Sequence, residues 1–275
     1  EWAEALDALW ESYDDWSHSQ TYLHIVSHHD AVDDAEAMYR RAIAFACEKV
    51  NGRVPVIAGT GSNETAYAVE LTKSACADGA DAVLVVTPYY NKTTQNGLVA
   101  MYNTIADAST KPVILYNVPS RTGIGIQPET YVKLAQHPNI AAIKEANSDI
   151  SKIVETFALV GDQLDIYSGN DDQIVPILSM GGQGCISVLS NVVPKETVAI
   201  TDQFFAGNVA EAARLQCQFM PLIRSLFCES NPIPVKAAMS ALGFCENYLR
   251  LPLVPMEQDH YETMLQRMRA LGLSV

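Results

Sequence analysis

Positive charge is scarce in this sequence, since 18 lysine and arginine residues stand against 32 acidic ones and the formal net charge is −14. No Lys/Arg cluster supplies the basic stripe that nucleic-acid binding needs, so nucleic acid is not expected as a partner. No apolar run is long enough to span a bilayer, and the first residues lack the pattern of a secretion signal. We therefore expect a cytoplasmic protein without a membrane partner.

Paired cysteine motifs are also lacking. The six cysteines are scattered singly with no CxxC pair, and most lie in apolar contexts, so we expect small buried hydrophobes in a reducing compartment and no nucleophile. They are Cys47, Cys76, Cys185, Cys217, Cys228 and Cys245. The group His24, His28, His29 and Asp30 matches no HExxH-type spacing, which favours a surface loop. No metal is expected.

Short apolar strands alternate with helical patterns through most of the chain. The 275 residues are 48% hydrophobic, enough for one large α/β core. Strands end near residues 27, 59, 87, 116, 144, 169 and 190. From residue 59 to residue 144 the ends recur about every 28 residues, which is the length of a strand–helix–strand repeat. The Val/Ile/Leu-rich strands indicate a parallel sheet that is covered on both faces.

A closed barrel explains this pattern better than a doubly wound sheet. No GxGxxG follows the first strand, and polar residues recur at every strand end rather than at one switch point. We predict a (β/α)8 TIM barrel over residues 1–207, with a helical extension over 208–275 packed on it. Only seven strands are visible and residues 2–16 read as a helix, so the first strand is expected to be missing or altered.

In a barrel the carboxyl ends of all strands converge on one face. Lys144 ends an apolar strand, where desolvation lowers the pKa of an amine and makes it available as a nucleophile for a carbonyl. Tyr116 can shuttle protons to and from that amine, and Arg121 can hold a carboxylate with two hydrogen bonds. Together they suggest class I aldolase chemistry on a small keto acid, without metal or cofactor.

Each of these residues also has an ordinary structural explanation. Lys144 could extend its amine to the rim of the barrel, and Tyr116 could be a buried strand aromatic. Arg121 could be a solvated loop charge. Tyr89 and Tyr90 could serve packing or an interface, where tyrosine is enriched. The residues alone leave these alternatives open.

Four strand-end motifs resemble the dihydrodipicolinate synthase family of the N-acetylneuraminate lyase superfamily. The resemblance runs from about Ala35 to the C-terminus, and Arg121 within Pro-Ser-Arg-Thr-Gly favours the synthases over the aldolases of the superfamily. The motifs are Val56-Ile57-Ala58-Gly59-Thr60-Gly61-Ser62-Asn63, Thr87-Pro88-Tyr89-Tyr90-Asn91, Tyr116-Asn117-Val118-Pro119-Ser120-Arg121-Thr122-Gly123 and Ile143-Lys144-Glu145-Ala146.

The resemblance implies a lyase of lysine and diaminopimelate biosynthesis that acts on pyruvate and aspartate semialdehyde. Lys144 would form an imine with pyruvate, and the derived enamine would attack the aldehyde. Tyr116 would relay protons, and Arg121 would hold the carboxylate of the semialdehyde. No cofactor is implied.

The resemblance also implies an assembly and a pocket. Tyr90 would reach into a neighbouring subunit's site, within a homotetramer built of two tight dimers. Backbone near Gly169 and Ile186 would line the pyruvate pocket.

One family motif is absent from the sequence. Where relatives carry a Gly-Thr-Thr-Gly-Glu-Ser loop, this sequence has Ser27 in the position of the relay threonine. Two alternatives therefore remain beside the synthase. One is another pyruvate-dependent aldolase or lyase, and the other is a catalytically impaired barrel that acts as a subunit or binding protein.

Overall fold

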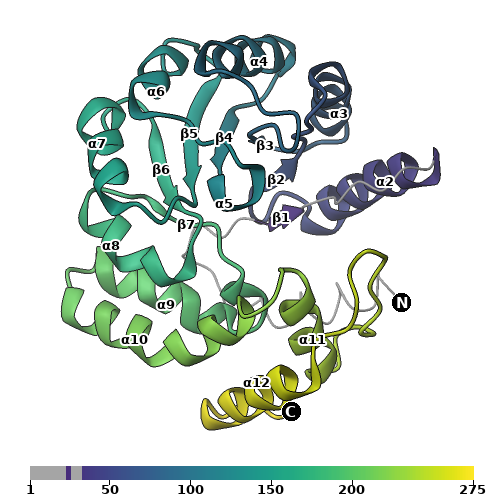
Figure 1. The fold of residues 1–275 in the computed structure, drawn as a ribbon, viewed down its shortest axis with the longest axis vertical. Coiled ribbons are helices and arrows are strands. Elements are labelled where there is room, and N and C mark those ends of the chain that lie inside the picture. The colour runs from purple at the N-terminus through teal and green to yellow at the C-terminus, as the bar shows by residue number, and fades with distance from the viewer. Residues whose placement is uncertain (1–22, 26–32) are drawn as a thin grey trace. The chain divides into compact units, whose positions relative to one another are not determined.

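A computed structural model describes the backbone of residues 23–25 and 33–275 and the side chains from Tyr39 onward (Figure 1). The described residues group into two compact units, residues 23–186 and Ser187–Val275. The predicted helix at 2–16 and Ser27 lie outside the described residues.

A parallel sheet forms the centre of the first unit. Its strands follow one another in chain order, each paired with the next. They are β1 (Leu23–Ile25), β2 (Val56–Gly59), β3 (Ala82–Val86), β4 (Val113–Asn117), β5 (Ile140–Glu145), β6 (Asp165–Ser168) and β7 (Gly184–Cys185). Within the described part of the chain, β1 and β7 pair on one side only. The predicted parallel α/β sheet is confirmed.

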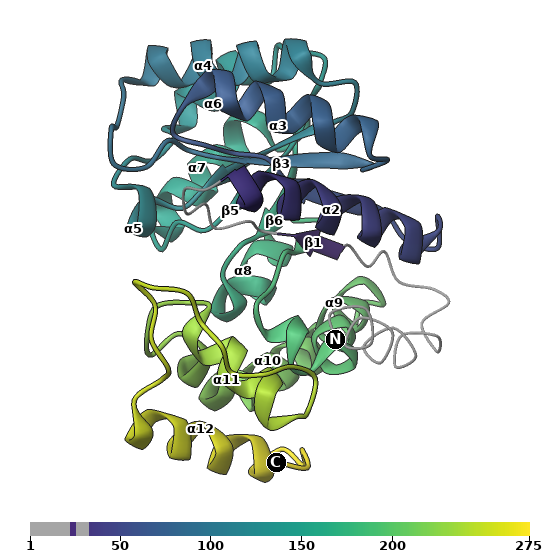
Figure 2. The ribbon, with the colours of Figure 1, turned by 90° about the vertical axis from the view of Figure 1, so that its right-hand side faces the viewer.

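Helices connect the strands, and the longer ones lie along the outer side of the curved sheet (Figure 1). They are α2 (Asp33–Val50), α3 (Thr65–Ala77), α4 (Gln95–Ala108), α5 (Pro119–Thr122), α6 (Pro128–Leu134), α7 (Ile150–Val160), η1 (Asp171–Gln173) and α8 (Ile174–Ser179). Figure 2 shows α3 and α4 stacked outside β3. The Tyr39 hydroxyl of α2 donates a hydrogen bond to the Gly59 carbonyl at the end of β2.

The two faces of the sheet carry different side chains, because successive residues of a strand point to opposite sides. One set packs under the helices in the main core, and includes Val85, Leu115 and Ile143. The other set forms a separate apolar cluster of Ile57, Leu84, Ile114 and Ala142, against which Tyr116 and Tyr167 pack. The second face is the concave one, and it leads to the carboxyl ends of the strands.

Polar residues fix where the helices begin. Asp149 accepts hydrogen bonds from the backbone N–H groups of Ser151 and Lys152 and so caps α7. Thr94 caps α4 in the same way, and Glu64 caps α3. These caps satisfy N–H groups that the first turn of a helix leaves without partners.

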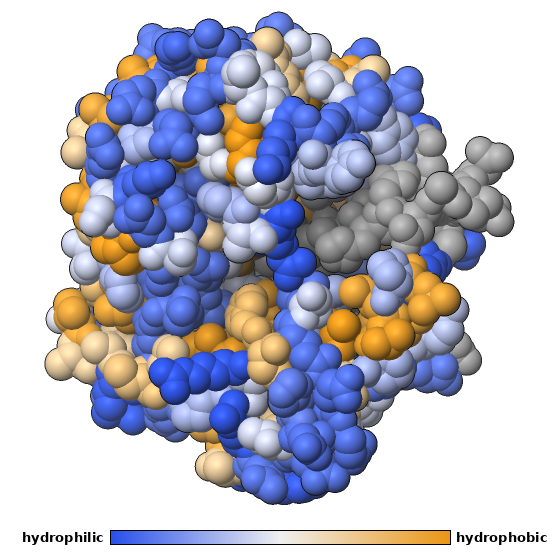
Figure 3. All heavy atoms as spheres, in the orientation of Figure 1, coloured by the Kyte–Doolittle hydropathy of each residue, from blue (hydrophilic) through white to orange (hydrophobic). Residues whose placement is uncertain are grey.

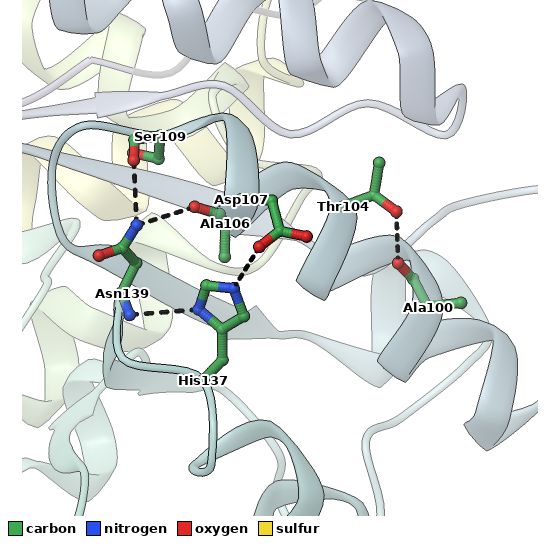
Figure 4. Close-up of polar contacts among 7 residues, drawn as sticks. All are labelled: Ala100, Thr104, Ala106, Asp107, Ser109, His137 and Asn139. Carbon is green, nitrogen blue, oxygen red and sulfur yellow. Dashed lines mark hydrogen bonds and ion pairs between the residues drawn. The ribbon is translucent and has the colours of Figure 1, made fainter.

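A group of side-chain hydrogen bonds fixes the start of β5 (Figure 4). Asn139 donates from Nδ2 to the carbonyls of Ala106 and Ser109, both at 3.0 Å. The Nε2 of His137 lies 3.0 Å from Asp107 Oδ1, and the Asn139 N–H donates to His137 Nδ1. The end of α4 is thus tied to the start of the strand that carries Lys144.

The strand predicted to end near residue 190 is shorter than expected. β7 ends at Cys185, and η2 (Leu189–Asn191) follows it. The cause is local hydrogen bonding, since Ser187 Oγ accepts from the Ser190 N–H and the Ser190 hydroxyl donates back to the Ser187 carbonyl. Serine side chains that bond nearby backbone in this way compete with strand pairing.

The second unit is helical after η2. Its helices are α9 (Pro194–Phe205), α10 (Val209–Leu226), α11 (Ile233–Ala241) and α12 (Gln258–Ala270). α10 packs against the other three around a separate apolar core. Residues 208–275 are largely helical, as predicted, whereas the division of the chain at residue 207 stays a prediction.

The expectation that the cysteines are buried was wrong for Cys217 and Cys228, which are exposed, and the other four are only half-buried. Cys217 lies in α10, and an apolar neighbourhood in sequence does not show which side of a helix a residue occupies. Cys228 follows the end of that helix. Of the helices described, none combines the length and apolar character needed to cross a bilayer. The face shown in Figure 3 is largely hydrophilic, with apolar residues in separate groups.

Candidate active site

Lys144 lies on the concave face near the end of β5. The parallel register places Tyr116 of β4 and Tyr167 of β6 directly beside it. The side chain does not extend into solvent, because the residue is only 7% exposed. Its Nζ lies 4.3 Å from the centroid of the Tyr116 ring. The predicted pairing of this lysine with this tyrosine is therefore present in the structure.

The pocket lowers the pKa of Lys144 to about 8. Burial is the main cause, and the positive charge of Arg121 lowers the pKa further, whereas the Asp171 carboxylate opposes both. Burial raises the pKa of Tyr116, and the charge of Arg121 partly offsets that rise. A lysine of this kind holds a substantial neutral fraction near pH 8, and the neutral amine is the form that attacks a carbonyl.

Gly169 directly follows β6 and Ile186 directly follows β7, each two residues beyond the position that is level with Lys144. A methyl group at Gly169 would lie 2.8 Å from the Ala146 Cβ and 3.1 Å from the Lys144 Cγ, so only glycine leaves room for the lysine stem. The Gly169 N–H donates to the Glu145 carbonyl at 2.7 Å. Ile186 is buried, and its N–H continues the sheet by donating to the Ser168 carbonyl.

Arg121 sits on the short helix α5, directly after β4, and is exposed. A hydrogen bond holds this helix to the end of β3, because the Thr87 hydroxyl donates to the Thr122 hydroxyl at 2.9 Å. The charge of Arg121 acts on both Lys144 and Tyr116. An exposed guanidinium beside a buried amine is suited to meet a carboxylate arriving from solvent.

Tyr90 does not join the buried pocket of its own chain. Its side chain is 93% exposed, and its backbone has a φ of 67°, which few residues other than glycine adopt. The turn is held by Asn63 Nδ2, which donates to the Tyr89 carbonyl, and by Asn91 Nδ2, which donates to the Asn63 carbonyl. An aromatic ring held outward by an ordered turn is available to a second copy of the chain.

Two further groups near Lys144 were not predicted from the sequence. Asp171 of η1 is buried, and its carboxylate raises the pKa values of both Lys144 and Cys185. Burial raises the pKa of Cys185 to about 12, so the thiol stays protonated and is not a nucleophile at neutral pH. Asp171 follows β6 almost directly, and its place at a strand end was the signal that could have identified it.

One cluster with metal-ligand chemistry occurs among the described residues. Cys228, Glu229 and His260 of the second unit have ligand atoms within 4.8 Å of one another. The Glu229 carboxylate already accepts from His260 Nδ1 and from the Glu257 N–H. The carboxylate thereby serves the N-terminus of α12, and we assign no metal to it.

Comparisons with known proteins give one consistent result. Residues 34–271 match the model of the "Dihydrodipicolinate synthetase family". A 4-hydroxy-tetrahydrodipicolinate synthase of Clostridium perfringens is 52% identical over 234 residues, which is 85% of this chain and 80% of the relative. The solved dihydrodipicolinate synthase of Thermotoga maritima is 42% identical, with a TM-score of 0.85 over 87% of this chain and 82% of that one.

A second solved structure holds a small molecule. The chloride-inhibited dihydrodipicolinate synthase of Acinetobacter baumannii was crystallised in complex with pyruvate. It is 36% identical to this chain, with a TM-score of 0.91, and the match covers all of this chain (100%) and 94% of that one.

Proposed function

The chain belongs to the dihydrodipicolinate synthetase family, and from this premise we propose the reaction that it catalyses. It condenses pyruvate with L-aspartate 4-semialdehyde to 4-hydroxy-tetrahydrodipicolinate, as a lyase of lysine and diaminopimelate biosynthesis. Curated relatives near 50% identity carry the synthase name. No finding favours another pyruvate aldolase or a binding protein.

The chemistry begins at the amine of Lys144. The neutral amine attacks the keto carbon of pyruvate and water leaves, which forms an imine. Loss of a methyl proton gives an enamine, whose carbon forms a C–C bond to the aldehyde carbon of the semialdehyde. The amino group of the semialdehyde then attacks the imine carbon, and the amine of Lys144 is released as the ring closes. Each step moves a proton, which requires a positioned acid–base group.

The buried Lys144 amine over the Tyr116 ring is the observation that carries this proposal. The pair combines a pKa lowered by burial with a phenol on the neighbouring strand. Tyr116 is the proton relay in this proposal. Because burial raises the pKa of the phenol, it stays protonated at neutral pH and can donate to a leaving hydroxyl.

The remaining site residues bind substrate in this proposal. Arg121 holds the carboxylate of the semialdehyde at the mouth of the pocket. The backbone near Gly169 and Ile186 lines the pyruvate pocket, and Ser27 supplies a hydroxyl in place of the relay threonine. Tyr90 completes the relay in a neighbouring subunit.

The architecture around the site is proposed with the function. The strands belong to a (β/α)8 barrel in which β1 takes the second strand position. Residues 208–275 form the C-terminal helical extension. The assembly is a homotetramer made of two tight dimers, and the reaction takes place in the cytoplasm.

Borohydride trapping tests the proposal directly. Incubating the protein with pyruvate and sodium borohydride should give one covalent adduct per chain, and peptide mapping should place it on Lys144. Lys144→Arg keeps the charge but lacks a reactive primary amine, so it should give no adduct and no turnover. A wild-type protein that gives no adduct on Lys144 would contradict the imine mechanism. Turnover of aspartate semialdehyde then distinguishes the synthase from an aldolase.

A further inference from the structure

Glu145 directly follows the reactive lysine but points to the other side of the sheet. Lys144 lies with Tyr116 on the concave face, so the next side chain enters the layer between sheet and helices. Glu145 is only 2% exposed there. The proposed chemistry leaves this buried carboxyl without a role.

Three neutral donors converge on the carboxylate. Asn117 Nδ2 lies 2.9 Å from Oε1 and 3.2 Å from Oε2. The Asn147 N–H donates to Oε1 at 2.9 Å, and the Tyr131 hydroxyl of α6 donates to Oε2 at 3.1 Å. Burial raises the pKa of Glu145 to about 7 in spite of these hydrogen bonds. Burying an ionised carboxylate here costs free energy of folding, so we expect Glu145 to have a role beyond packing.

The hydrogen bonds extend from Glu145 to the segment that carries Arg121. Asn117 uses its Oδ1 to accept from the Ile126 N–H at 3.0 Å. Asn117 therefore joins the first residue of the 117–126 segment to its last. α5 lies within this segment, two residues beyond Asn117. A backbone hydrogen bond also links the residue after Glu145 to Asn117, since the Ala146 N–H donates to the Asn117 carbonyl at 2.8 Å.

We propose that Glu145 is a positioning residue for substrate recognition. By orienting the Asn117 amide and the Tyr131 hydroxyl, it holds the 117–126 segment in the one arrangement that keeps Arg121 at the mouth of the Lys144 pocket. This inference rests on the proposed function, because Arg121 is taken to bind the semialdehyde carboxylate. It assigns to Glu145 no contact with either substrate.

The role of the hydrogen bond between Asn117 and Glu145 can be tested by exchanging which side chain donates and which accepts. In Glu145→Gln, an amide N–H₂ would face the N–H₂ of Asn117, and turning Asn117 over would withdraw its Oδ1 from Ile126. In the double variant Glu145→Gln/Asn117→Asp, the introduced amide can donate to the introduced carboxylate. With the amide oxygen in the Oε1 position, it can still accept from the Asn147 N–H, and the Tyr131 hydroxyl at the Oε2 position can turn to accept from the amide N–H₂. The introduced carboxylate can still accept from the Ile126 N–H.

The kinetic constants for the two substrates report the effect. We expect Glu145→Gln to raise the KM for aspartate semialdehyde by about tenfold or more, as small displacements of a binding group do. The KM for pyruvate should change by less than about twofold, because Lys144 and Tyr116 stay in register. The double variant should recover most of the lost affinity for the semialdehyde. Tyr131→Phe removes one donor and should give a smaller change in the same direction.

Asn139→Ala is the matched control at the other end of the same strand. It removes two hydrogen bonds that a side-chain amide donates to backbone carbonyls and lowers thermal stability, but it lies away from the 117–126 segment (Figure 4). It should leave both KM values unchanged. If Glu145 served stability alone, Glu145→Gln would behave like Asn139→Ala, with a lower melting temperature and unaltered KM values.

The outcomes separate this inference from the function on which it rests. A wild-type protein with no pyruvate adduct and no turnover overturns both. An active wild type whose Glu145→Gln variant keeps its KM for the semialdehyde overturns the positioning role alone. So does a folded double variant that recovers nothing. Should Glu145→Gln fail to fold, Tyr131→Phe and the double variant decide the matter by the same two KM values.

Discussion

The titration of a single amine sets the pH range of the first chemical step. Because the pKa of Lys144 is lowered to about 8, its neutral fraction rises as pH increases from 6 to 8 and changes little above 9. We expect the initial rate of borohydride-trapped imine formation with pyruvate to follow that curve. An ordinary lysine would show rates that keep rising towards pH 10.5. Trapping rates measured across this range, with protein folding checked at each pH, decide between them.

The neighbouring carboxyl predicts a pH dependence of stability. The pKa of Glu145 is raised from 4.5 to about 7 by burial, so the folded state binds more protons than the unfolded state between these values. The stability that this group contributes is fully present below pH 4.5 and is lost as pH rises through 7. Because glutamine does not ionise, the Glu145→Gln variant should not lose this stability as pH rises.

The measurement compares the two proteins at several pH values. The free energy of unfolding of Glu145→Gln relative to wild type should increase by about 3 kcal/mol at most between pH 5 and pH 8. Denaturant unfolding at each pH gives that difference, and titrations common to both proteins cancel. A constant difference would show that Glu145 is ionised throughout the range.

For individual residues, part of the candidate site could be predicted from the sequence. Strand spacing alone placed Lys144 and Tyr116 at equivalent ends of adjacent strands, and their contact follows from the parallel register. Glu145 was not recognised, because no local pattern shows that a charged residue will be buried by a helix from elsewhere in the chain. Such burial is a tertiary effect.

Among the elements, α7 offers a test of local capping. Asp149→Ala removes the acceptor for two backbone N–H groups at the start of the helix. The cost should be about 1 kcal/mol in the free energy of unfolding. Asp162→Ala, an exposed carboxylate just beyond the end of the same helix, is the control and should change stability little. Equal losses for the two variants would argue against the cap.

Element positions were predicted well wherever periodicity and caps agreed. The ends of β2 to β6 fall close to their predicted places, since Val/Ile/Leu runs specify the strands. β7 was predicted too long because its apolar residues continue the pattern while Ser187 and Ser190 bond each other's backbone. Side-chain hydrogen bonds of this kind are not visible in hydropathy.

For the whole molecule, the outward Tyr90 predicts a shared active site. If Tyr90 serves the site of a neighbouring subunit, Tyr90→Phe and Lys144→Arg should each be nearly inactive as pure proteins. Co-expression of the two variants should restore activity, because a mixed dimer holds one site with an intact Lys144 and a wild-type Tyr90 from its neighbour. Activity of differently tagged, co-purified pairs measures this. Mixtures no more active than their components would contradict a shared site.

The strand that ends in Lys144 and Glu145 has a consequence for how this sequence can change. From Ala142 to Glu145 the side chains of β5 alternate between the two sides of the sheet, so Ala142 and Lys144 lie on the concave side and Ile143 and Glu145 lie towards the helices. Deleting or inserting a single residue within this alternating stretch would reverse its order, bringing an acid into the catalytic cavity and an amine beneath the helices. A change in length by one residue is therefore not tolerable there, whereas the register shift between Ile140 and Ala142 shows that one extra residue is accommodated just before the stretch.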